Sequence, residues 1–190
     1  MVFVDAFLDA ADEVLNSNTF LVKTMLVSGD VQKDLTAFIA SDDFLTQILE
    51  ADIARGWFNL HDSFERETPA PKAGLLVRPA FVLKVRKATL TAQVYLVAML
   101  TADRRAGNFF SFYQRARSQD EARILTRNLM AGICGDKSPD LYILEPDFLA
   151  DATTEPGELY YFEGSNGACD SAAAIVCGQM AYLLLTNGAP

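Results

Sequence analysis

The stretch that decides the predicted fold is residues 75–100, LLVRPAFVLKVRKATLTAQVYLVAML. Residues 75–85 are rich in Leu and Val, and residues 89–100 alternate between two faces, with Leu90, Ala92, Val94, Leu96 and Ala98 on one and Thr91, Gln93, Tyr95, Val97 and Met99 on the other. A period of two with β-branched and aromatic residues is typical of a strand, so the stretch predicts two consecutive strands. Their link, residues 86–88, contains no Gly or Asn to encode a tight hairpin turn. A bent hairpin and one long interrupted strand therefore both stay open.

The chain before this pair of strands is mostly helical in pattern. Residues 4–15 and 31–39 place apolar side chains at helical spacing, with acidic residues on the opposite face of the first. Ser41 is a suitable N-cap for a third helix, which extends as far as Gly56. Between the first two helices, residues 19–27 form a short apolar run that is typical of a strand.

The chain after the pair of strands predicts one well-defined helix and several strands. Ser118 and Glu121 have the spacing of a capping box at the start of a helix. Residues 141–144 and 158–163 predict short strands. Residues 172–186 combine Ala-rich helical character with β-branched residues, and we favour a strand that completes the sheet.

These elements predict the α+β class, with a mainly antiparallel sheet flanked by helices. The length of 190 residues suits a single domain. Within it we expect a helical N-terminal part (1–56), a loop or arm (57–74) and a sheet-containing core (75–190).

Acidic and basic residues are segregated along the chain, whose net charge is −9. Residues 1–67 hold 13 acids and 4 bases, residues 68–137 hold 12 bases and 4 acids, and the rest holds 8 acids and no base. These blocks either neutralise one another within the fold or meet between subunits, where complementary charge sets register and partner choice. A chain this acidic is a poor candidate for binding nucleic acid through its phosphates.

The sequence offers few residues for catalysis or metal binding. Three cysteines without CxxC spacing predict buried free thiols, and a single histidine excludes most His-based metal sites. Cys169 is conceivable as a nucleophile with His61 as its base, but the two residues are more than a hundred positions apart in the sequence. No Lys or Arg lies close to Cys169 in the sequence to stabilise a thiolate. We therefore predict a protein that is not an enzyme and has no cofactor, no metal site and no catalytic residues.

Other common site motifs are also missing from the sequence. It contains no glycine-rich phosphate loop and no GxSxG elbow. Paired carboxylates such as Asp42 and Asp43 lie at helix starts, where capping explains them. No apolar run is long enough to cross a membrane and the N-terminus lacks a basic region, so we expect no transmembrane segment and no signal peptide.

An arginine-rich and aromatic segment at residues 101–117 is the strongest candidate for a functional surface. Arg and aromatic residues together are typical of the centres of protein–protein interfaces. The alternative is that the aromatic rings face the core while the arginines extend to solvent. The candidate subunit-interface residues are Arg104, Arg105, Phe109, Phe110, Phe112, Tyr113, Arg115 and Arg117.

The order of elements resembles the tail-terminator, or tail-completion, proteins of Mu-like contractile-tailed phages. The resemblance covers residues 75–186 and rests on the sequence of residues 78–83 (RPAFVL), the run 94–105 that ends in TADRR, the helix 121–133 and the closing run 181–186 (AYLLLT). These are patterns of strand and helix, not signature residues. The N-terminal region is longer than the family pattern, and residues 150–172 have no counterpart in it.

The resemblance implies a virion protein, made in the host cytoplasm, that forms a ring, usually of six copies. Such a ring would contact the tail tube, the sheath and the head–tail connector, with DNA passing through it without specific binding. The alternative is a small cytosolic binding protein, such as an immunity protein that neutralises a toxin. An enzyme of unknown chemistry is a third possibility.

Overall fold

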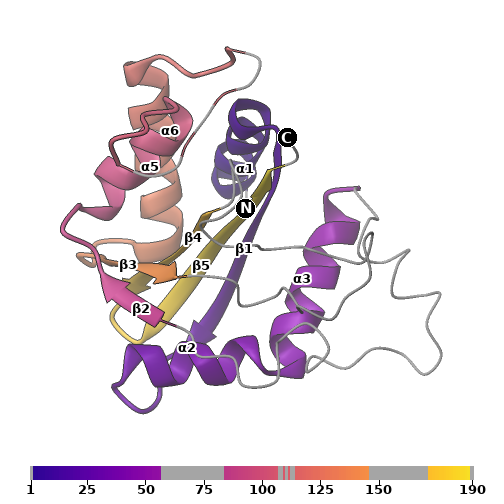
Figure 1. The fold of residues 1–190 in the computed structure, drawn as a ribbon, viewed down its shortest axis with the longest axis vertical. Helices are drawn as coiled ribbons and strands as arrows, with labels where there is room; N and C mark the ends of the chain where they lie inside the picture. Colours follow the sequence, from indigo (N-terminus) through magenta and orange to yellow (C-terminus); the bar gives the residue numbers. More distant parts are fainter. Residues whose placement is uncertain are drawn as a thin grey trace.

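The computed structural model describes residues 2–56, 84–106, 109, 111, 114–145 and 171–188. A five-stranded antiparallel sheet lies between two layers of helices (Figure 1). The predicted α+β class, with a mainly antiparallel sheet flanked by helices, is therefore confirmed. In the described part of the chain, no helix combines the length and the hydropathy that a membrane span requires.

The sheet brings together strands from both ends of the chain. Its order is β1-β5-β4-β3-β2, and every neighbouring pair is antiparallel. The bounds of the strands are β1 Ser17–Met25, β2 Lys84–Lys87, β3 Asp140–Glu145, β4 Ser171–Cys177 and β5 Met180–Gly188. Strands β1 and β2 thus form opposite edges of the sheet.

The strands are apolar on both faces because each face is covered by helices. In β5, Leu183 and Leu185 pack against α2 (Val31–Ile39) and α3 (Asp42–Ala54), while Leu184 packs in the opposite layer. That second layer consists of α1 (Val2–Leu15), α5 (Ala92–Leu100) and α6 (Gln119–Cys134). Side chains that alternate along each strand therefore serve two separate cores.

Most of the predicted elements are confirmed. The helices expected at residues 4–15 and 31–39 are α1 and α2, and the strands expected at 19–27 and 141–144 are β1 and β3. Ser41 caps α3 by accepting a hydrogen bond from the Phe44 N–H at 3.2 Å. The expected strand at 158–163 lies outside the described residues.

The predicted strand at residues 89–100 is wrong, because residues 92–100 form helix α5. Thr91 is its N-cap and accepts a hydrogen bond from the Val94 N–H. The segment is apolar on every side, so a period of two and a helical period fit it equally well. Its neighbour at residues 75–85 falls mostly outside the described residues; from Lys84 the chain forms the short edge strand β2.

Residues 172–186 are extended, as predicted, but they form two strands instead of one. Strands β4 and β5 are joined by a two-residue turn at Gly178 and Gln179. Gly178 has a φ of 69°, which glycine adopts without steric cost in tight hairpin turns. The Ala-rich composition is explained by helices on both sides of this hairpin, since small side chains allow close approach.

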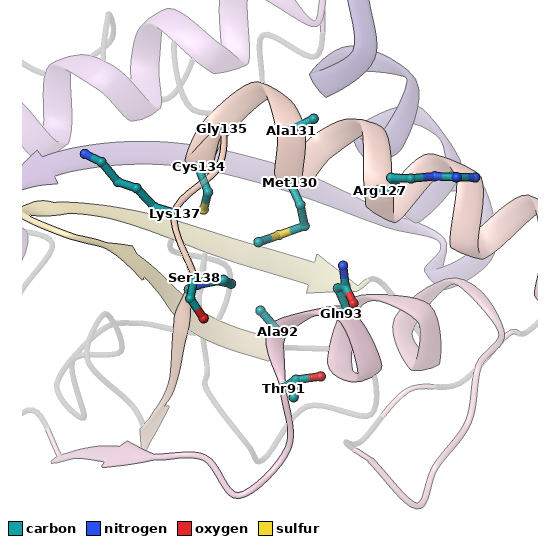
Figure 2. Close-up of a pocket in the computed structure, with 11 residues that line it drawn as sticks. Thr91, Ala92, Gln93, Arg127, Met130, Ala131, Cys134, Gly135, Lys137 and Ser138 are labelled. Atoms are coloured by element: carbon teal, nitrogen blue, oxygen red, sulfur yellow. The ribbon is translucent and has the colours of Figure 1, made fainter.

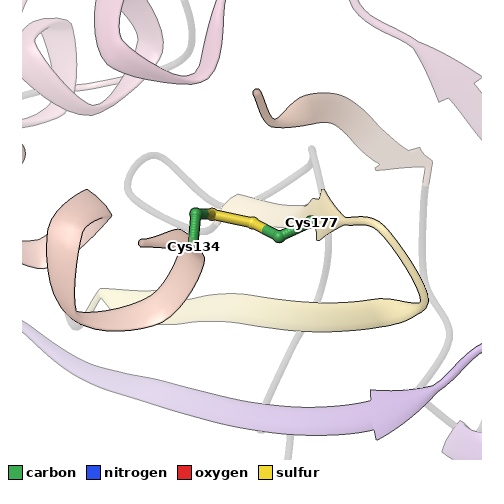
Figure 3. The surroundings of a disulfide bond; sticks show 2 residues. All are labelled: Cys134 and Cys177. Atoms are coloured by element: carbon green, nitrogen blue, oxygen red, sulfur yellow. A yellow bond between two sulfur atoms is a disulfide. The ribbon is translucent and has the colours of Figure 1, made fainter. Parts of the chain in front are cut away.

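The prediction of free cysteines is wrong for two of the three. Cys134, at the end of α6, forms a disulfide with Cys177, at the end of β4 (Figure 3). The Cα atoms of the two residues are 5.4 Å apart, although 43 residues separate them in the sequence. Cys169 lies outside the described residues.

Replacement of Ser118 by Ala should lower the free energy of unfolding by about 1 kcal/mol. Its hydroxyl accepts from the Glu121 N–H at 3.3 Å, and the Glu121 carboxylate accepts from the Ser118 N–H at 3.1 Å, so the predicted capping box is present. Ser118→Gly should cost only a few tenths of a kcal/mol, because glycine is tolerated at an N-cap. Urea denaturation of the wild-type protein and the two variants tests this order; a Ser118→Ala variant as stable as the wild-type protein would show that the cap contributes nothing.

Candidate functional site

The predicted interface segment is divided by the fold into buried and exposed parts. Phe109 is buried and packs edge-on against Tyr95 of α5, with ring centres 5.1 Å apart. This ring serves the core, as the alternative interpretation expected. Phe110, Phe112 and Tyr113 lie outside the described residues.

The arginines of the segment also take different roles. The Arg117 guanidinium donates to Glu13 of α1, and the Arg117 N–H donates to the Leu100 carbonyl at 2.8 Å, so Arg117 ties the loop to two helices. Arg104, Arg105 and Arg115 are exposed. Arg105 is held by Asp103 through two side-chain hydrogen bonds of 2.9 and 2.7 Å, which lower the pKa of Asp103 to about 2.

Of these three arginines, Arg105 borders a shallow groove between α5 and the start of α6. The groove has a volume of about 490 Å³. Its floor is apolar, formed by Val94, Val97, Ala98 and Ala106, and its rim includes Asp103, Arg105, Gln119 and Arg123. We call this feature the α5–α6 groove. An apolar floor with a charged rim is the usual organisation of a protein–protein interface.

Helix α5 supplies an unusual outer surface to this groove. It contains no charged residue, and Val94 on its outer side is 49% exposed. Sequence reasoning missed this surface because it assigned the segment to a strand inside the sheet. The one local signal in the sequence is Thr91, a residue type suited to an N-cap, because the spacing of the residues after it does not distinguish a helix from a strand.

A second cavity of about 400 Å³ lies between the start of α5, the C-terminal half of α6 and the loop that leads to β3. Figure 2 shows Met130 and Cys134 directed from α6 towards α5, with Gln93 directed back towards α6. Arg127 and Lys137 stand at opposite ends of the cavity. None of these residues was a candidate in the sequence, because they come from separate elements.

A partly buried charged cluster joins the two helical layers around the β1 edge of the sheet. Arg55, which caps α3, donates to Asp9 and Asp12 of α1 at 2.7 and 2.6 Å. Burial raises the pKa of Asp12 to about 6, although Thr19 and Arg55 act in the opposite direction. Gln47 of α3 further protects this edge by bonding both the N–H and the carbonyl of Lys23, at 2.9 and 3.0 Å.

Another buried carboxylate, Asp34, stabilises a turn. It accepts from the Val27 and Ser28 N–H groups at 2.8 and 2.9 Å. Burial opposes ionisation of Asp34, but these hydrogen bonds outweigh it and hold its pKa below the usual value. Both this carboxylate and the Arg55 cluster have structural partners, so neither needs a ligand to explain it.

The charge blocks of the sequence lie at different edges of the sheet. The acids of the first block that the structure describes lie mainly on α1 and α3, beside β1. The basic block includes Lys84, Arg86 and Lys87 of β2, at the opposite edge, and the arginines around the α5–α6 groove. Among the described residues, the acids of the first block therefore lie beside β1, and the basic side chains of β2 lie at the opposite edge, where Lys87 pairs with Asp140 of β3 at 2.8 Å.

Within the described ranges, no group of three or more His, Cys, Asp and Glu side chains could hold a metal ion. The considered pair Cys169 and His61 falls outside these ranges. No family model, curated protein or solved structure matches the chain.

Proposed function

We propose that this protein is a non-enzymatic assembly protein, a ring-forming tail terminator of a phage tail or of a tail-like contractile machine. The observation that carries the proposal is the α5–α6 groove. Helix α5 is uncharged and exposes Val94 beside Arg105 and Arg123, an apolar centre with a charged border of the kind that interfaces use. A second copy of the chain would cover its apolar floor.

The distribution of charge supports association of copies in one direction. Acidic helices beside β1 and basic side chains in β2, at opposite edges of the described sheet, would favour head-to-tail contacts, in which each copy uses two different surfaces. Contacts of this kind close into rings when the rotation between neighbours allows it. A ring would join the tail tube and sheath to the head–tail connector.

The disulfide between Cys134 and Cys177 is compatible with a place in a phage particle. Disulfides persist in oxidising surroundings and are rare in the cytosol. A particle that is assembled inside cells and then released would meet such surroundings after release. The bond would then stabilise the mature particle.

The mass of the purified protein in solution, measured by light scattering at low and high salt, tests the proposal. We expect a discrete ring near six subunits that loosens at high salt, because salt screens the charges between copies. A monomer at every concentration and salt would contradict self-assembly of the free protein and favour the alternative, a small binding protein.

Substitution of Val94 by Asp should weaken self-association at least tenfold, because a carboxylate would have to lose its water on the groove floor. Val94→Asp should leave the fold intact, since the side chain is half exposed. Ile124→Asp is a matched control, because Ile124 of α6 is also 49% exposed but does not line the groove. Sedimentation equilibrium measures the self-association constant of each variant. Equal weakening by Val94→Asp and Ile124→Asp would show that the contact between copies does not lie in the groove.

A further inference from the structure

The cavity of Figure 2 carries a charge pattern that the proposed assembly does not use. Arg127 of α6 and Lys137 stand at its two ends, and none of its lining residues is acidic. In the described part of the chain, neither cation has a carboxylate within 4.0 Å, as is also true of Lys33 on α2, whereas Arg55, Arg105, Arg117 and Arg123 each have one.

The walls of the cavity can contact both polar and apolar groups. Met130, Ala131 and Pro139 give an apolar wall, and Gln93 and Ser138 contribute an amide and a hydroxyl. The side chains of Gln93 and Ser138 make no hydrogen bond to any other described residue. The volume of about 400 Å³ lies within the range of small-molecule sites.

The base of the cavity is held in place by the fold. The disulfide between Cys134 and Cys177 fixes the end of α6 to the sheet. The loop continues with a hydrogen bond from the Lys137 N–H to the Cys134 carbonyl at 3.1 Å. The Lys137 side chain then crosses Gly178 in the β4–β5 turn, where a Cβ would come within 3.4 Å of the ammonium nitrogen. A fixed frame reduces the entropy lost when a ligand binds.

We infer that this cavity binds a small organic anion. Its phosphate or carboxylate groups contact Arg127 and Lys137, and its apolar part lies on Met130 and Pro139. Arginine pairs with either anion through two parallel hydrogen bonds, and lysine adds a compact charge. Both cations are exposed, and their long side chains, which extend away from the cavity in Figure 2, can turn towards a ligand from the two ends. The cavity shares Gln93 with the α5–α6 groove, but neither Arg127 nor Lys137 lines that groove.

Titration with two probes tests the inference and separates the two kinds of anion. The probes are adenosine 5′-monophosphate, for a phosphate, and citrate, for carboxylates; adenosine and potassium chloride at matched ionic strength are the controls. Calorimetry measures affinity, and amide chemical shifts of Gln93, Ala131 and Lys137 locate the binding. We expect saturable binding of at least one anion with a Kd below about 1 mM.

Variants show whether anion binding depends on the cavity or only on the general charge of the protein. Arg127→Gln and Lys137→Gln should each weaken binding at least tenfold, while Lys33→Gln on α2, in the opposite helical layer, should leave it unchanged. Ala131→Leu keeps the charge and suits a helix, but its larger side chain fills part of the cavity, so it should also weaken binding at least tenfold. Thermal unfolding checks that each variant is folded.

Three results would overturn the inference: no saturable binding of either anion, an equal loss in Lys33→Gln, or full binding by folded Ala131→Leu. Because the readout is binding by the free chain, none of these results depends on whether the protein forms rings.

Discussion

Reduction of the Cys134–Cys177 disulfide should lower the free energy of unfolding by about 4 kcal/mol. The bond closes a loop across a sequence separation of 43 residues, and in the chain-entropy description it removes that much conformational freedom from the unfolded chain. It also joins the end of α6 to the strand β4 at the centre of the sheet. Urea denaturation with and without a dithiol reductant measures the loss.

Two variants control this experiment. Cys134→Ala/Cys177→Ala should have the reduced stability in both conditions, because it has no bond to reduce. Cys169→Ser should keep the full sensitivity to the reductant. If the wild-type protein unfolds at the same urea concentration in both conditions, the disulfide does not contribute to stability.

Replacement of Asp12 by Asn should change how stability depends on pH. Burial raises the pKa of Asp12 from 3.8 to about 6 in the folded protein, so the folded state holds the proton more tightly than the unfolded chain. The contribution of Asp12 is therefore fully present below about pH 4 and is lost as the pH rises through 6. Relative to Asp12→Asn, the wild-type protein should lose up to about 3 kcal/mol between pH 4 and pH 7.

Urea denaturation of both proteins at several pH values gives this difference directly. Other carboxylates affect both proteins alike, so only the difference between the two curves reports on Asp12. Asp9→Asn removes the second partner of Arg55, and because the Asp9 side chain is 66% exposed it should cost less than about 1 kcal/mol at neutral pH. A wild-type curve that stays parallel to the Asp12→Asn curve would contradict the raised pKa of Asp12.

The α5 segment shows why local pattern misled the prediction. The hydrophobic period of a helix or strand can be recognised only when polar residues mark its exposed side. Residues 92–100 contain almost no polar residues. Tertiary packing selects the helix over a strand, because in the helix Tyr95, Leu96 and Met99 enter the core shared with α1 and α6. The groove that rests on α5 could not be predicted for the same reason.

The Arg104–Arg117 segment was identified by composition, but composition does not say which side chains are buried. Phe109 turned inward onto Tyr95, and Arg117 was used to bind Glu13 of α1. Arg105 stayed at the rim of the groove. The burial of Phe109 and the pairing of Arg117 were thus decided by contacts with residues that are distant in the sequence.

The sequence by itself determined the elements whose signals are local: the helices with an amphipathic period, the Ser41 and Ser118 caps, the strands of β1 and β3, and the antiparallel α+β class. Only the tertiary structure decided the helix at residues 92–100, the Cys134–Cys177 bond, the Arg55 cluster and the two cavities. Caps and amphipathic periods act over a few residues, whereas disulfides, ion pairs and cavities join residues that the chain keeps far apart until the sheet forms.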